Sequence, residues 1–458
     1  MSLVWTRVWR LSWTRALRRK VVTVNRRSID THPISPDTFP SFREVPNTGV
    51  IYVMTRAQQE GFAYGSPLWA NLGQGAPETG PLAIGEHRLT QMDIDPSCSE
   101  YSPVAGIREL REAVATLYNA RYRQGLASQY TYENVAISSG GRSGLARVVA
   151  SLAPVHLGHY LPDYTAYEEL FDAFKGFVPI PILLQEADGF QATAAQLQEE
   201  IVARGLGAVL LSNPNNPTGQ VIAGRELEAY VGVGRRYRCA LIFDEFYSHY
   251  IYDDIAREQA SLSAAAYVED VNRDMVILVD GLTKNWRYPG LRISWTIGPK
   301  AIIQRFASAG SFLDGGAAHP IQRAVVPLLD RSEADAQARI IQTEFTIKRQ
   351  LMMDGIAQLG LKLVQKPRGS FYCFAQLSSL PEALRDGMQF FDAALPHKVI
   401  TVPGKFFDVN PGHRRSHIPS RLNSYVRLSF GPKRDELVRG LEGLKQVLKV
   451  PTHLGKVL

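Results

Sequence analysis

The stretch Met275-Val-Ile-Leu-Val279-Asp-Gly-Leu-Thr-Lys284-Asn-Trp-Arg-Tyr-Pro-Gly-Leu-Arg292 decides how this chain is interpreted. It opens with an apolar run of strand length, and polar residues, including Lys284, come directly after it. Similar runs occur at 135–137, 208–211, 240–243 and 293–297. Apolar runs without alternation predict strands buried on both faces, and helical stretches separate several of them. The sequence therefore predicts an α/β fold with a mostly parallel central sheet flanked by helices.

Polar groups come after three of the other runs as well. They are Ser138-Ser-Gly-Gly-Arg-Ser-Gly144, Ser212-Asn-Pro-Asn-Asn-Pro-Thr-Gly219 and Asp244-Glu-Phe-Tyr247. Each group alone has an ordinary explanation as a turn or a loop. In an open parallel sheet, however, ligands bind beyond the carboxyl ends of the strands. Four such groups at four strand ends therefore predict one shared site.

Two of these groups are suited to a phosphate. Gly140 and Gly141 precede an apolar helical stretch, and a glycine-rich turn into a helix exposes backbone N–H groups that bind anions. The Arg292 guanidinium can bind the same anion through two parallel hydrogen bonds. We predict a phosphate site between these residues.

The remaining groups are suited to a pyridine ring. Lys284 at a strand end can form a Schiff base with an aldehyde cofactor. The Asp244 carboxylate can keep a pyridine nitrogen protonated, which makes the ring an electron sink. Tyr247 and Asn216 can hydrogen-bond a phenolic oxygen. Together with the phosphate site, these residues predict a pocket for pyridoxal 5′-phosphate.

From about Asn71 to its C-terminus, the chain resembles the class I/II pyridoxal-phosphate-dependent aminotransferases of fold type I. The most specific match is Lys284 followed eight residues later by Arg292 within Pro-Gly-Leu-Arg. The resemblance implies that an amino group moves between an L-amino acid and a 2-oxo acid. It implies a ping-pong mechanism through an aldimine at Lys284, as in amino acid metabolism and biosynthesis. No metal is expected.

The resemblance also implies roles for residues outside the four groups. Arg427 in Asn423-Ser-Tyr-Val-Arg-Leu-Ser-Phe-Gly431 matches the arginine that grips the substrate α-carboxylate, with Asn216 beside it. Gly75 in Leu72-Gly-Gln-Gly-Ala-Pro77 matches a loop whose backbone meets the same carboxylate. Tyr164 matches the aromatic residue that stacks on the ring.

Three further residues are expected at the cofactor phosphate. Thr283 and Arg142 lie close in sequence to the lysine and to the glycine turn. Tyr101 in Tyr-Ser-Pro-Val-Ala-Gly106 matches a tyrosine that reaches the phosphate of the neighbouring subunit. The expected assembly is therefore a homodimer with active sites at the interface.

One position departs from the family pattern. Three residues before the lysine, the family commonly has a serine that donates to the phosphate, and here Gly281 stands there. Ser139, Ser143, Thr283 or water are candidate replacements for the lost hydroxyl. A net hydrogen bond contributes about 0.5–1.5 kcal/mol, so we expect weaker cofactor binding rather than its loss.

The expected organisation has four parts. Residues 1–48 are a basic leader and an irregular lead-in. Residues 49–103 contribute to a smaller domain and to dimer contacts. Residues 104–332 form the large cofactor-binding domain, and residues 333–458 form a small α+β domain.

Two alternatives stay open at this point. The same fold and pocket support lyases and cyclases that act by carbon–sulfur lysis, β/γ-elimination or amino-acid cyclisation. A non-catalytic sensor on this fold is a remote alternative, because no helix-turn-helix pattern precedes the match.

The net charge of +7 is concentrated near the N-terminus. Eight basic residues and no acidic ones lie within residues 1–27, and the remaining 43 basic residues nearly balance the 44 acidic ones. This distribution excludes a nucleic-acid-binding body. The leader is a candidate transit peptide or interfacial helix, or else a poorly ordered extension or sequence upstream of the true start. Any membrane contact is therefore expected only through residues 1–27. Otherwise we expect a cytoplasmic protein, because the three cysteines are far apart and match no disulfide framework.

Overall fold

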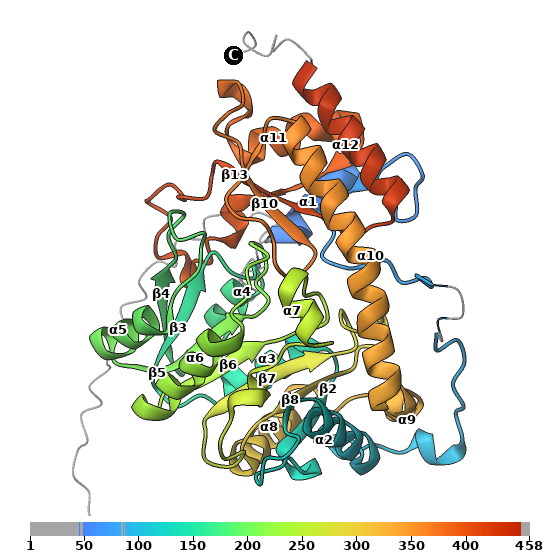
Figure 1. Ribbon diagram of the computed structural model, residues 1–458, viewed down its shortest axis with the longest axis vertical. Helices are drawn as coiled ribbons and strands as arrows, with labels where there is room; N and C mark the ends of the chain where they lie inside the picture. The colour runs from blue at the N-terminus through green and yellow to red at the C-terminus, as the bar shows by residue number, and fades with distance from the viewer. Residues whose placement is uncertain (1–44, 46–48, 84–85, 87, 450–458) are drawn as a thin grey trace, which may run out of the picture. The chain divides into compact units, whose positions relative to one another are not determined.

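A seven-stranded sheet is the centre of the computed structural model, which describes residues 45, 49–83, 86 and 88–449 (Figure 1). The strand order is β2-β8-β7-β6-β5-β3-β4. β8 is antiparallel to both of its neighbours, and the other adjacent pairs are parallel. This mixed but mostly parallel arrangement confirms the predicted sheet. Its strands are β2 (Val135–Ser138), β3 (His156–Leu161), β4 (Val178–Leu183), β5 (Leu206–Ser212), β6 (Ala240–Asp244), β7 (Val276–Gly281) and β8 (Ser294–Ile297).

Both faces of this sheet are buried under helices. Alternate residues of β6 belong to different hydrophobic clusters: Leu241 and Phe243 pack with Leu227 of α6, while Ile242 packs with Val148 of α3. The absence of polar alternation in the strands results from this double burial. The α-helices of this part of the chain, in sequence order, are α2 (Arg108–Tyr122), α3 (Gly141–Ala150), α4 (Tyr167–Ala173), α5 (Ala194–Arg204), α6 (Gly224–Tyr237), α7 (Asp253–Glu258), α8 (Lys300–Leu313) and α9 (His319–Val325).

The sequence did not predict β3 and β4. β3 contains His156, Gly158 and His159, so it has no continuous apolar run. β4 lies at the edge of the sheet and contains Pro179 and Pro181. Proline cannot donate to a ladder and is therefore confined to edge strands, which explains both its place here and the missing strand pattern.

A second, antiparallel sheet follows the long helix α10 (Arg331–Gln358), which was predicted over about 333–359. The strand order is β12-β13-β10-β9. Its strands are β9 (Lys362–Leu363), β10 (Tyr372–Gln376), β12 (Val402–Pro403) and β13 (Tyr425–Ser429), accompanied by α11 (Gly387–Ala394) and α12 (Arg434–Lys449).

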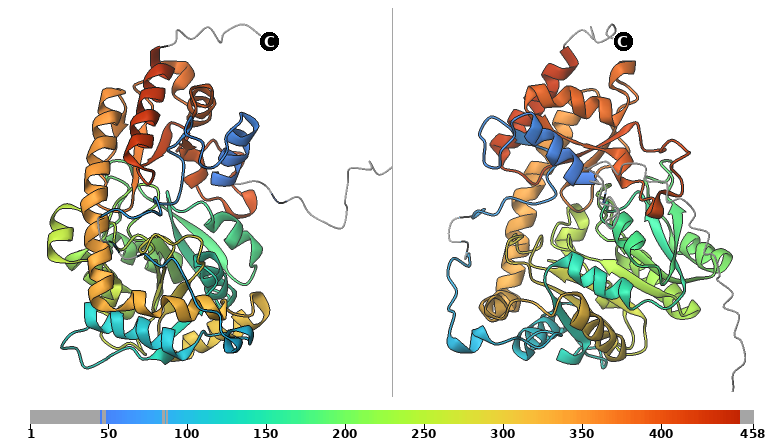
Figure 2. Two further views of the ribbon diagram at one scale, coloured as in Figure 1. Left: turned by 90° about the vertical axis from the view of Figure 1, so that its right-hand side faces the viewer. Right: turned by 180° about the vertical axis from the view of Figure 1, so that it is seen from behind.

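The N-terminal segment joins this C-terminal region. β1 (Ala70–Asn71) pairs in parallel with β11 (Val399–Ile400). Helix α1 (Gly49–Gln59) lies beside the C-terminal elements in Figure 2 and contacts β11 and β12. Residues more than 300 positions apart are thereby brought together, and the loop after β1 reaches the ends of the large sheet.

The leader and lead-in expected over 1–48 lie outside the described residues, except for Val45. In the described part of the chain, no helix has the length and apolar character needed to cross a bilayer. The proposed boundaries near residues 103 and 332 stay a prediction.

Candidate functional site

The polar residues expected at the strand ends do meet at one edge of the large sheet. Asp244 is the last residue of β6, Asn216 lies four residues after β5, and Lys284 lies three residues after β7. Since β5, β6 and β7 are neighbouring parallel strands, their carboxyl ends place these three side chains together.

Lys284 is fixed by hydrogen bonds at its side-chain amine and at its backbone carbonyl. Its amine donates to the Gly75 carbonyl, and its own carbonyl accepts from the Tyr250 hydroxyl at 3.0 Å. Burial lowers the pKa of its amine to about 7, and the positive charges of Arg427, Arg142 and Arg292 act in the same direction. With this pKa, a substantial fraction of the amine is neutral at neutral pH, and the neutral form is the one that acts as a nucleophile or base.

Asp244 is buried, with a donor on each carboxylate oxygen. The Tyr167 hydroxyl donates to one oxygen at 2.9 Å, and the Phe246 amide donates to the other at 3.4 Å. Burial raises the pKa of this carboxyl to about 6, although the two donors and Lys284 oppose the rise. Tyr167 was not predicted as a site residue, because an aromatic residue in a helical pattern is usually part of a core.

Arg427 is a buried cation without an acidic partner among the residues that the structure describes. Its exposed fraction is 1%. Its two terminal nitrogens donate to the Asn216 side-chain oxygen and to the Gly73 carbonyl, both at 2.8 Å, while its Nε has no partner. Within the described residues, no carboxylate forms an ion pair with it. A buried arginine is stabilised by a carboxylate in bidentate geometry, so this side chain fits an incoming carboxylate.

Two tyrosines line the space between these groups. The Tyr247 and Tyr372 hydroxyls are 2.9 Å apart, and the guanidinium of Arg427 lies 4.1 Å from the centroid of the Tyr372 ring. Burial raises the pKa of Tyr372 to about 12, so both hydroxyls are protonated donors near neutral pH. Tyr372 was not predicted as a site residue, and the structure places it directly against Arg427.

The glycine turn before α3 fits a phosphate. Gly140 caps the helix with a φ of +86°, and any Cβ there would collide with the Arg292 guanidinium. The Thr283 hydroxyl is buried and unpartnered. Free backbone N–H groups at a helix N-terminus, an exposed arginine and an orphaned hydroxyl are the features a phosphate satisfies.

The structure explains the unusual Gly281. This residue pairs with Ser294 of the antiparallel strand β8, and a Cβ would lie 2.6 Å from the Ile293 carbonyl oxygen. Of the candidate replacements for the missing hydroxyl, Ser139 donates to the Gly316 carbonyl at 3.2 Å, and Ser143 donates to Asp314. Both are occupied within the protein, which leaves Thr283 as the free hydroxyl.

Arg142 and Tyr164 also lie at this edge. Arg142 donates to the Tyr164 hydroxyl at 3.2 Å, and the Tyr164 ring packs edge-on against Tyr167, the donor to Asp244. Tyr101 differs from all the other predicted residues, because its side chain is 97% exposed and the single chain does not bring it to the site.

These observations together fit pyridoxal 5′-phosphate. The phosphate would meet Gly140, Gly141, Thr283 and Arg292, and the ring nitrogen would meet Asp244. Two features favour such a ligand: the Thr283 hydroxyl has no partner among the described residues, and glycine at position 140 lets the Arg292 guanidinium lie against the turn.

Comparisons with known proteins point in the same direction. The family model for aminotransferase class I and II matches residues 68–444. The aspartate/prephenate aminotransferase of Thermus thermophilus is 29% identical over 354 residues, which cover 76% of this chain and 83% of that protein. The aspartate aminotransferase of Sulfurisphaera tokodaii is 24% identical over 387 residues, which cover 82% and 89%.

Solved structures share the fold. The Thermus thermophilus aspartate aminotransferase with maleate has a TM-score of 0.70 at 24% identity and covers 89% of this chain and 100% of its own. An aminotransferase from Mycobacterium tuberculosis has a TM-score of 0.71 at 25% identity, with coverage of 88% and 97%. None of these four proteins is named as a lyase, a cyclase or a regulator, so the alternatives gain no support from them.

Proposed function

We propose a role for each residue of this site on the premise that the chain belongs to the class I and II aminotransferases, which depend on pyridoxal 5′-phosphate. Lys284 is the catalytic residue. When bound, the cofactor supplies an aldehyde carbon for the amino group and a ring that spreads negative charge from the substrate α-carbon. The observation that carries this assignment is the place of the Lys284 amine at the meeting point of three strand ends, where burial shifts it toward its neutral form.

The substrate end is formed by Arg427, Asn216 and the loop at Gly73–Gly75. Arg427 binds the α-carboxylate, because its guanidinium is buried, can form two parallel hydrogen bonds, and has no acidic partner among the described residues. This contact orients the amino acid so that its α-proton faces the Lys284 amine, which removes the proton and later returns it.

The cofactor end keeps the ring and the phosphate in place. Asp244, oriented by Tyr167, would hold the ring nitrogen, and Tyr247 and Asn216 would donate to the phenolic oxygen. Tyr164 would pack on the ring. Gly141 and Arg142 would provide backbone N–H groups for the phosphate, beside the turn at Gly140, and Thr283 and Arg292 would add side-chain donors.

Replacing the catalytic lysine tests the proposal. Lys284→Ala should lose the yellow, borohydride-reducible link to the cofactor and nearly all turnover. Lys300→Ala is the matched control, since this exposed lysine pairs only with Glu133 on the surface. Full turnover of Lys284→Ala would contradict the assignment.

We infer an acidic amino donor as the substrate class. The Sulfurisphaera tokodaii relative is named for aspartate and the Thermus thermophilus relative for aspartate and prephenate. Arg142 also offers a second cation at the site, and it pairs with no carboxylate among the described residues. An acidic side chain would bind this guanidinium in place of its neutral contact with Tyr164. A panel of amino donors against one oxo acid tests this inference, and a preference for neutral donors would contradict it.

We also propose a homodimer in which Tyr101 completes the neighbouring site. The support is its exposed fraction of 97%, which a single chain leaves unexplained. Mixing inactive Lys284→Ala chains with impaired Tyr101→Ala chains should restore activity, because one site of each hybrid dimer then carries neither substitution. If mixing restores nothing, Tyr101 does not act across an interface.

The cytoplasmic location stays a proposal. Cys98, Cys239 and Cys373 are free and buried, which suits a reducing compartment. A fusion of residues 1–27 to a fluorescent protein should stay diffuse in the cytoplasm. Import into an organelle would identify the leader as a transit peptide instead.

A further inference from the structure

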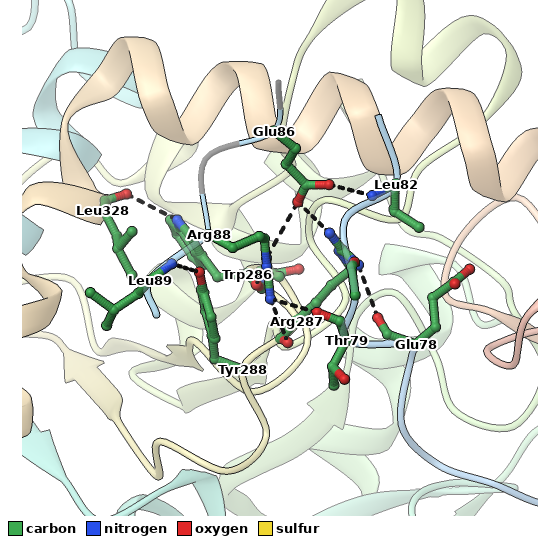
Figure 3. Close-up of polar contacts among 12 residues, drawn as sticks. Glu78, Thr79, Leu82, Glu86, Arg88, Leu89, Trp286, Arg287, Tyr288 and Leu328 are labelled. Atoms are coloured by element: carbon green, nitrogen blue, oxygen red, sulfur yellow. Dashed lines mark hydrogen bonds and ion pairs between the residues drawn. The ribbon is translucent and has the colours of Figure 1, made fainter. Parts of the chain in front are cut away.

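A buried ion pair ties the loop of the catalytic lysine to a segment that the sequence did not single out. The segment comprises the described residues 78–83, 86, 88 and 89, here named the strap. Arg287, three residues after Lys284, forms an ion pair with Glu86 of the strap (Figure 3). Both side chains are at most 1% exposed. The same guanidinium donates to the carbonyls of Glu78 at 3.0 Å and Gly80 at 2.6 Å.

A second arginine, on the strap, binds the backbone of the lysine loop. Arg88 of the strap donates to the carbonyls of Trp286 at 2.9 Å and Arg287 at 3.0 Å, and it stacks 3.9 Å from the centroid of the Tyr288 ring. The Leu89 amide donates to the Tyr288 hydroxyl at 2.6 Å. Each side of the contact therefore places an arginine on backbone carbonyls of the other side.

The backbone at Arg287 is itself strained. Its φ is +58°, a value that favours glycine, while its amide donates to the Lys284 carbonyl at 2.9 Å. Such a conformation persists only where the surroundings over-determine it. The three acceptors that the strap offers to the Arg287 side chain supply that constraint.

The strap continues directly from the loop that touches substrate-binding groups. Gly75, whose carbonyl accepts from the Lys284 amine, lies three residues before Glu78. The Glu78 amide donates to the Gly431 carbonyl at 2.9 Å, just beyond the strand that carries Arg427. The strap thus connects the loop of Lys284 to the loop at Gly75 and to the end of the strand that carries Arg427.

We propose that Arg287 is a positioning residue, which sets the distance between the Lys284 amine and the Gly75 carbonyl by clamping the strap through Glu86, Glu78 and Gly80. The proposal rests on the assignment of Lys284 as the catalytic residue. Arginine is needed because its planar fork binds a carboxylate and two carbonyls at once, which lysine or glutamine cannot do.

The test measures the Lys284 amine directly, in the full-length chain freed of cofactor. Acetic anhydride acylates neutral amines, so the extent of acylation at the Lys284 peptide, measured by mass spectrometry against pH, gives the pKa of this amine. We expect a midpoint near 7 in the unmodified chain. In Arg287→Gln, water reaches the amine, and the midpoint should rise by about one unit or more.

Turnover of the cofactor-loaded protein provides the second readout. A misplaced amine impairs the proton transfer, so Arg287→Gln should lower kcat by roughly 10²-fold and raise KM much less. Arg287→Lys, which keeps the charge, should recover part of the loss. The matched control is Arg235→Gln on helix α6, away from the strap, which removes the bidentate contact of Arg235 with Asp274. It should lower Tm without moving the Lys284 midpoint.

Glu86→Gln keeps the test decisive if Arg287→Gln does not fold. It leaves the two carbonyl contacts in place, so the midpoint should shift in the same direction by a smaller amount. An unchanged midpoint and an unchanged kcat in a folded variant of this pair would overturn the proposal. This failure is distinct from failure of the proposed function, which would show as an active Lys284→Ala.

Discussion

The two ends of the site are built in different ways. At the phosphate end, glycine at position 140 leaves room for the Arg292 guanidinium, the Thr283 hydroxyl has no partner among the described residues, and Arg292 stays exposed to solvent. At the carboxylate end, Arg427 is buried and its partners Asn216 and Gly73 come from segments more than 140 residues apart. Arg292 at the phosphate end is exposed to water, whereas the charge of Arg427 lies where water is excluded. Because electrostatic interactions are stronger in such surroundings, losing Arg427 should reduce binding more than losing a donor at the phosphate end.

Of the two ends, the carboxylate end should show the larger effect when a residue is replaced. Arg427→Leu should lower kcat/KM for the amino donor by roughly 3 kcal/mol, on the order of 10²-fold, because a buried charged contact to the substrate is lost. Cofactor retention should not change. Steady-state kinetics check this, with Arg434→Gln as the control, since Arg434 is half exposed and pairs with Glu344. A loss below tenfold would show that the carboxylate binds elsewhere.

A smaller effect is expected at the phosphate end from Gly140→Ala. The methyl group strains a φ of +86° and displaces the Arg292 guanidinium, so cofactor affinity should fall by roughly tenfold while KM for the amino donor is nearly preserved. Fluorescence titration of the cofactor measures this. Gly205→Ala is the matched control, with a φ of +60° and open space around it. Equal cofactor affinities in the two variants would show that Gly140 is not part of the phosphate site.

The smallest effect is expected from Thr283→Val. Loss of one hydroxyl donor should weaken cofactor binding by about 0.5–1.5 kcal/mol, or roughly two- to tenfold. Thr346→Val, whose hydroxyl donates to a carbonyl within α10, is the control for a lost hydrogen bond away from the site. An unchanged dissociation constant would indicate that water, rather than Thr283, replaces the serine hydroxyl that Gly281 lacks.

The comparison of the two ends also shows which features the sequence reveals. The glycine turn and the Lys284-to-Arg292 spacing are local, so the residues directly after each apolar run are enough to find them. Tyr167 could not be found in this way, because only the fold places its hydroxyl on Asp244. The sequence likewise offered three hydroxyls to replace the missing serine, and only packing shows that Ser139 and Ser143 are already bonded.

The same distinction applies to the fold and to the strap. Buried central strands were predicted because double burial leaves a continuous apolar run, whereas β4 was missed because prolines interrupt it at the sheet edge. The strap has no sequence pattern at all. Glu86 and Arg287 are 201 positions apart, and nothing local indicates that either charge is buried.

One measurement tests the central claim most directly. The cofactor-loaded protein is reduced with borohydride, digested, and its peptides are mapped by mass spectrometry. We predict that the peptide containing Lys284 alone gains the mass of the reduced cofactor. The label on another lysine, or no label on a protein that transaminates, would contradict the account.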